Sequence, residues 1–115
     1  MCFFSTKKVK ETEGEVCLNA DKKRVAEFSR RYLQIMPEKY IMSREVYEDT
    51  DDVLHFRIVV GTNGRPVSDF ELTARYTALE GFGTKLCLHM VGSGVINNTK
   101  QLLKAYIKEF GEMKQ

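Results

Sequence analysis

Apolar and polar residues alternate along three stretches in the middle of the chain. The even-numbered residues are apolar within residues 53–60, and the same alternation runs from Phe70 to Tyr76 in residues 67–76 and from Leu86 to Met90 in residues 84–91. A period of two is typical of strands that bury one face and expose the other. The even-numbered side chains from Leu54 to Met90 are therefore predicted to face a core, and the odd-numbered side chains to face away from it.

Two amphipathic helices flank these strands. Apolar residues recur at spacings of three and four from Val25 to Met36, and the helix is expected to end at Met36 because Pro37 lacks the N–H needed to continue it. A second stripe of this kind ends at Gly111, as expected of a helix-terminating glycine. Residues 39–47 are rich in strand-forming residues and predict a fourth strand.

The order of elements predicts an α+β fold. Short turns force neighbouring strands to be antiparallel, which gives a four-stranded meander. Both helices are expected on one face of the sheet, in the order α-β-β-β-β-α, because each strand has only one apolar face. Residues 1–18 lack clean periodicity and are predicted to be a flexible N-terminal arm, with a short strand near residues 15–18 as an alternative. The length of 115 residues suits one domain, over residues 19–115.

Strand register was predicted from the rule that paired residues share a face. A three-residue turn after residue 61 pairs Phe56 with Phe70, and it also pairs Arg57 with Asp69 and His55 with Glu71. The same rule in the next hairpin pairs Leu72 with Leu88, Ala74 with Leu86, and Glu71 with His89. The prediction is a row of His55, Glu71 and His89 across three strands.

This row has two interpretations. A carboxylate between two imidazoles could bind a divalent metal or transfer protons near neutral pH. Alternatively, the pairs simply stabilise a solvated sheet. The sequence alone leaves both open.

Charge is distributed unevenly, although the net charge is only +2. Residues 1–37 carry eight Lys or Arg against five Asp or Glu, a local charge of +3. Nucleic-acid binding is therefore an alternative function. The candidate cations are Lys7, Lys8, Lys22, Lys23, Arg24, Arg30 and Arg31. The same residues also suit the solvated face of an amphipathic helix.

The chemistry of the chain does not indicate an enzyme. Its three cysteines form no zinc or redox motif, and the expectation is reduced thiols in the cytoplasm. Cys87 is predicted to be inert, because no histidine neighbours it on its strand pair. The sequence shows no signal peptide or membrane span, and no cofactor is expected.

The leading prediction is a non-catalytic binding domain. Its open sheet face, or an edge strand, would hold a protein partner or a second copy of the chain. The residues predicted to form the open face are His55, Arg57, Asp69, Glu71, Thr73, Arg75, Lys85 and His89. The alternatives are a nucleic-acid-binding protein and a metal-binding or acid–base enzyme that uses the row of His55, Glu71 and His89.

Overall fold

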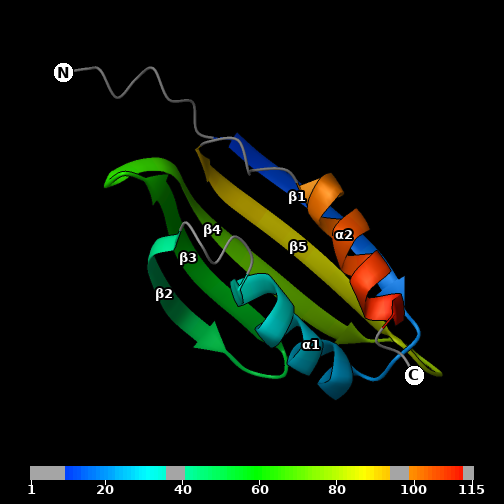
Figure 1. Cartoon of the computed structure of the whole chain (residues 1–115). Helices are drawn as coiled ribbons and strands as arrows, with labels where there is room; N and C mark the ends of the chain where they lie inside the picture. The colour runs from blue at the N-terminus through cyan, green and yellow to red at the C-terminus, as the bar shows by residue number, and fades with distance from the viewer. Residues whose placement is uncertain (1–9, 36–40, 94–98, 113–115) are drawn as a thin grey trace.

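The computed structural model describes residues 10–35, 41–93 and 99–112, which form a five-stranded antiparallel sheet and two helices (Figure 1). In chain order the elements are β1 Lys10–Leu18, α1 Lys22–Ile35, β2 Ile41–Asp49, β3 Val53–Thr62, β4 Arg65–Ala78, β5 Thr84–Ser93 and α2 Thr99–Glu112. The strand order across the sheet is β1-β5-β4-β3-β2. The α+β class and the antiparallel pairing are confirmed.

The prediction of four strands is wrong, because residues 10–18 form β1 instead of part of a flexible arm. This strand pairs antiparallel with β5 and completes the sheet on that side. Its core-facing side carries Thr12 and Gly14 before the apolar Val16 and Leu18, so the apolar signal is confined to its second half. A Cβ atom on Gly14 would lie 2.6 Å from Cδ1 of Leu103 in α2, so a larger residue there would require this side-chain end to shift. Residues 1–9 lie outside the described residues.

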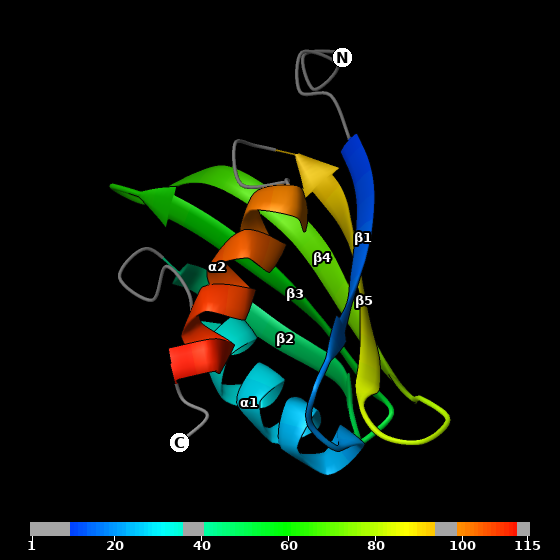
Figure 2. The same ribbon diagram turned by 90° about the vertical axis from the view of Figure 1, so that its right-hand side faces the viewer.

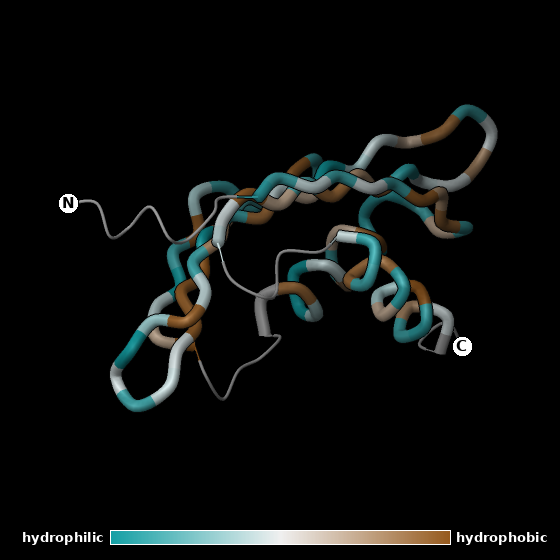
Figure 3. Tube along the Cα trace, turned by 90° about the horizontal axis from the view of Figure 1, so that it is seen from above, coloured by the Kyte–Doolittle hydropathy of each residue, from teal (hydrophilic) through white to brown (hydrophobic). Residues whose placement is uncertain are grey.

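Both helices lie on one side of the sheet (Figure 2 and Figure 3). Helix α1 packs over β3, β4 and β5, and α2 packs over β1 and β5. Phe28 of α1 joins the two helices, because its ring meets the rings of Tyr106 and Phe110 edge-on at centroid distances of 5.0 and 5.1 Å. The predicted core alternation is confirmed in β3, β4 and β5. Its buried apolar members are Leu54, Phe56, Ile58, Val60, Phe70, Leu72, Ala74, Tyr76, Leu86, Leu88 and Met90.

The register of the β3–β4 hairpin differs from the prediction by two residues. Asn63 and Gly64 form a two-residue turn with positive φ angles of 52° and 75°, a backbone conformation typical of tight hairpins. An irregularity follows, in which Val60 pairs with Ser68 while Gly61 pairs with Pro66. The extra residue, Val67, restores the alternation of faces. Phe56 therefore lies opposite Leu72 instead of Phe70.

The β4–β5 register is also displaced by two residues. Leu72 pairs with Met90 and Ala74 with Leu88, so the predicted pairs of Leu72 with Leu88 and Ala74 with Leu86 are wrong. The cause is the length of β4, which continues to Ala78. The loop that remains covers residues 79–83.

Candidate functional site

The helices leave the opposite face of the sheet uncovered, and we call it the outer face. The side chains predicted there all belong to β3, β4 or β5 and are exposed or half-buried: His55, Arg57, Asp69, Glu71, Thr73, Arg75, Lys85 and His89. Their odd numbering places them opposite the buried even-numbered residues. The outer face therefore carries mostly polar side chains on β3, β4 and β5, with Val59 and Val91 among them.

Two of the predicted cross-strand pairs are present in spite of the changed register. Nε2 of His55 lies 2.9 Å from Oε1 of Glu71. Arg57 donates from Nε and Nη2 to the two carboxylate oxygens of Asp69 at 2.9 and 2.7 Å. These hydrogen bonds raise the pKa of the Arg57 guanidinium. The partners are diagonal instead of directly opposite, and side chains of this length reach across that spacing.

The predicted row of His55, Glu71 and His89 is divided into separate pairs. His89 lies opposite Thr73 on β4 and opposite Glu13 on β1. Its Nε2 atom is 2.5 Å from Oε2 of Glu11, within hydrogen-bonding distance. His89 therefore interacts with β1, which was predicted to be part of a flexible arm.

An open depression lies on the outer face over β1, β5 and β4. It has a volume of about 610 Å³, and its polar lining consists of Glu13, Glu15, Thr73, Arg75, Cys87 and His89. The sequence analysis missed Glu11, Glu13 and Glu15. Glutamate at every second position of residues 11–15 was the signal that could have placed them on one face of a strand.

Cys87 lies in this depression as a thiol. Its Sγ atom is 3.6 Å from Oε1 of Glu15. Partial burial and the neighbouring carboxylate raise the pKa of Cys87. Because the thiolate is the nucleophilic form, this environment makes the side chain a poor nucleophile.

The edge strand β2 exposes an unusual amount of apolar surface. Every residue from Met42 to Asp49 is exposed. Met42 and Val46 each expose 44% of their surface and Tyr47 exposes 46%. The Tyr47 ring also contacts the ring of His55 at a centroid distance of 4.9 Å, which connects the edge to the outer face.

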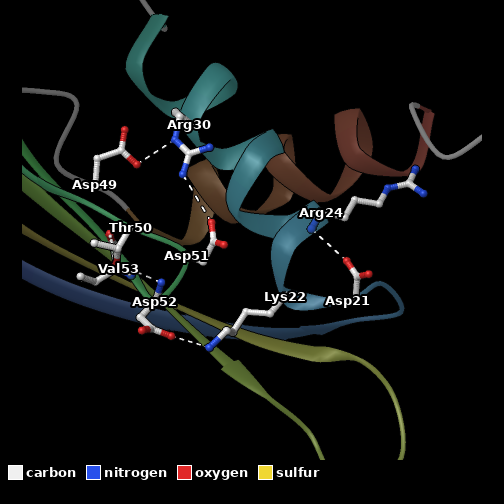
Figure 4. Close-up of polar contacts among 9 residues, drawn as sticks. All are labelled: Asp21, Lys22, Arg24, Arg30, Asp49, Thr50, Asp51, Asp52 and Val53. Atoms are coloured by element: carbon white, nitrogen blue, oxygen red, sulfur yellow. Dashed lines mark hydrogen bonds and ion pairs between the residues drawn. The ribbon is translucent and has the colours of Figure 1, made fainter.

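Part of the predicted nucleic-acid surface pairs with carboxylates of the same chain (Figure 4). Lys22 forms an ion pair with Asp52. Nε of Arg30 lies 2.7 Å from Oδ1 of Asp49.

Three further cations of α1 are placed differently from Lys22 and Arg30. The Arg24 guanidinium lies over the Phe110 ring at 5.8 Å, while Lys23 and Arg31 are exposed. Lys7 and Lys8 lie outside the described residues. Nucleic-acid binding stays a prediction.

Comparisons with known proteins identify the fold. No family profile matches the sequence, and no curated protein matches it. Protein DR_A0006 from Deinococcus radiodurans is similar in structure, with 12% sequence identity, coverage of 91% of this chain and 96% of that chain, and a TM-score of 0.57. Mll3558 from Rhizobium loti follows with 14% identity, coverage of 92% and 94%, and a TM-score of 0.54. CV1439 from Chromobacterium violaceum has 12% identity, coverage of 90% and 96%, and a TM-score of 0.51.

The fold is helix-grip-like. At this level of identity the likeness concerns the fold alone. In this fold the two helices cover the inner face of the sheet. The outer face and the free edges of β1 and β2 are left uncovered. None of the helices in residues 10–35 and 99–112 is long and apolar enough to cross a membrane.

Proposed function

We propose that this chain is a non-catalytic binding domain that holds a second copy of itself through the edge strand β2. The observation that carries the proposal is the exposed apolar surface of Met42, Val46 and Tyr47 on an edge strand. Methionine and aromatic residues are enriched at protein interfaces. An edge strand also presents unpaired backbone groups to which another strand can add.

The charges on the two edges favour β2 over β1. Strand β1 carries Glu11, Glu13 and Glu15 on one face, and pairing with a second β1 would bring like charges together. Strand β2 instead carries Arg44 among acidic residues and apolar ones. A two-fold interface uses the same patch on both copies, so it must contain both halves of every complementary contact.

An antiparallel pairing centred on Val46 is consistent with the faces of β2. Arg44, Val46 and Asp49 lie on the inner face, because each pairs with a buried residue of β3. The irregularity between Val46 and Glu48 adds one residue, so in the proposed pairing Arg44 of one copy would lie beside Asp49 of the other. Asp49 already accepts a hydrogen bond from Arg30, so the new contact would extend an existing ion-pair network.

Sedimentation equilibrium tests this proposal. The wild-type chain is expected to show a monomer–dimer equilibrium at concentrations up to roughly 1 mM, where an association of about −4 kcal/mol is still visible. Val46→Lys should weaken association at least about tenfold, because it places a charge at the centre of the interface. Tyr47→Lys, which changes the neighbouring residue, should act in the same direction.

Ile107→Lys is the matched control. Ile107 on α2 exposes 43% of its surface, nearly the same fraction as Val46, but it lies on another element. The control should associate as the wild type does. A monomeric wild type over the whole range, or equal association of Val46→Lys and wild type, would contradict the proposal.

A further inference from the structure

Three side chains of types that can ligate a metal lie close together on the outer face, near the edge of the sheet formed by β1. They are Glu11 and Glu13 of β1 and His89 of β5, and one ligand atom from each lies within 4.8 Å of the others. Within the described part of the chain, no other group of three such side chains comes this close. We propose that Glu11, Glu13 and His89 form a binding site for a divalent transition-metal ion of the Mn²⁺ or Zn²⁺ class.

The backbone places these side chains on regular and well-supported strands. Glu11 and Glu13 are two residues apart and therefore share a face of β1. His89 lies directly opposite Glu13, and the β1–β5 ladder runs without a register shift from Lys10 to Leu18. Close packing of Leu103 over Gly14 adds support, because it fixes β1 against α2. The ligands thus project from paired strands and not from a loop, which favours a defined geometry.

The ligand set determines the class of ion. Carboxylate oxygens suit Mg²⁺, Ca²⁺ and Mn²⁺, whereas imidazole suits zinc and other first-row transition metals. Two carboxylates with one imidazole therefore favour ions that accept both, such as Mn²⁺ and Zn²⁺.

The distances are within reach of a coordination sphere. Oxygen and nitrogen ligands lie about 2.0–2.2 Å from zinc, so ligand atoms of one tetrahedral ion are about 3.4 Å apart. At present Nε2 of His89 and Oε2 of Glu11 are 2.5 Å apart, the distance of a hydrogen bond. Replacement of this hydrogen bond by an ion requires the exposed Glu11 carboxylate to move outward by roughly 1 Å, which rotation of its side chain permits.

The surroundings of the three ligands offer open space and one further carboxylate. Glu13 and His89 also line the open depression, which leaves space beside the ion for water or for a polar group of a ligand. Glu15 follows Glu11 and Glu13 on the same face of β1, and a divalent cation would offset the repulsion among these carboxylates. The site lies near the β1 edge of the sheet, and β2 forms the other edge. The site is therefore independent of self-association through β2.

The pair of His55 and Glu71 provides a matched control within the same molecule. It lies on the same face, with Nε2 of His55 2.9 Å from Oε1 of Glu71. The two imidazoles are similarly exposed, at 32% of the side chain for His55 and 36% for His89. His55 is not a member of the three-ligand group, so it should not hold the ion by itself.

Isothermal titration with MnCl₂ tests the proposal, because Mn²⁺ avoids the thiolate chemistry by which the cysteines could take up zinc. The wild type and His55→Ala are expected to bind one equivalent with the same affinity. His89→Ala and Glu13→Gln should each bind at least about tenfold more weakly, since loss even of a ligand's supporting partner costs 10–100-fold. Glu13→Gln keeps the side-chain shape, and circular dichroism checks that every variant is folded.

Paramagnetic broadening gives a second readout. Bound Mn²⁺ should broaden the ring proton signals of His89 at low ion-to-protein ratios, before those of His55. No binding up to roughly 1 mM Mn²⁺ would overturn the proposal, because such affinity is weaker than about −4 kcal/mol. Equal affinity of His89→Ala and wild type, or a loss of binding in His55→Ala as large as in His89→Ala, would also overturn it.

Discussion

The hydroxyl of Ser29 connects two buried tyrosines in the core. Its Oγ atom lies 2.7 Å from the hydroxyl of Tyr106, and both residues are fully buried. The Ser29 hydroxyl also lies close to that of Tyr76, and burial raises the pKa of Tyr76 to about 12 from its ordinary value of 10.0. Burial likewise raises the pKa of Tyr106. Both hydroxyls therefore favour the neutral form in the folded state.

The raised pKa of Tyr76 predicts a loss of stability in alkaline solution. The folded state holds the proton more tightly than the unfolded state, so the contribution is complete below pH 10 and is lost as pH rises through about 12. Urea unfolding at pH 9 and pH 11 should show a decrease of about 1 kcal/mol from this residue. In Tyr76→Phe the decrease should be smaller by that amount. Parallel decreases in both proteins would show that Tyr76 does not contribute.

At the scale of elements, Gly92 of β5 lies directly opposite Phe70 of β4. A Cβ atom on Gly92 would lie 2.3 Å from the carbonyl oxygen of Asp69 and 2.4 Å from Cα of Phe70. These are backbone atoms, so the strands themselves would have to separate. We expect Gly92→Ala to lower the free energy of unfolding by about 1–3 kcal/mol, measured by chemical denaturation.

Gly111→Ala is the matched control for that substitution. A Cβ atom on Gly111 meets no atom within 4 Å, and the residue lies inside α2. Alanine should therefore stabilise the chain by up to about 1 kcal/mol, because it favours the helix over glycine. Similar changes in the two variants would contradict the close approach at Gly92.

The sequence predicts the faces of the strands well and their register poorly. Alternation depends on burial, and the structure buries the even-numbered residues within 54–60, 68–76 and 84–90. Register depends on local irregularities such as the one at Val67, which no hydrophobic pattern reveals. Strand β1 was missed because Thr12 and Gly14 face the core side and interrupt the apolar alternation that Val16 and Leu18 continue.

The candidate site could be predicted only in part for the same reasons. His55 with Glu71 and Arg57 with Asp69 are present, because diagonal neighbours on one face stay within reach after a two-residue shift. The partners of His89 could not be found, since Glu11 and Glu13 belong to the strand that was taken for an arm. Because β1 was not predicted, the outer-face residues that it carries could not be included in the predicted site.

At the scale of the whole molecule, the helices occupy one face of the sheet and leave the other face and the outer edges of β1 and β2 uncovered. The proposed metal site lies on β1 and β5, and the proposed self-association surface lies on β2. The two surfaces lie toward opposite edges of a sheet with the strand order β1-β5-β4-β3-β2. Each can therefore be removed by substitution without disturbance of the other.

Hydrogen–deuterium exchange at several protein concentrations tests self-association through β2 most directly, because it reports on each edge separately. Between about 10 µM and 1 mM protein, amide exchange in β2 should slow as the second copy covers the edge, while exchange in β1 stays constant. Exchange in β2 that is independent of concentration, or protection that rises in β1 instead, would contradict the account.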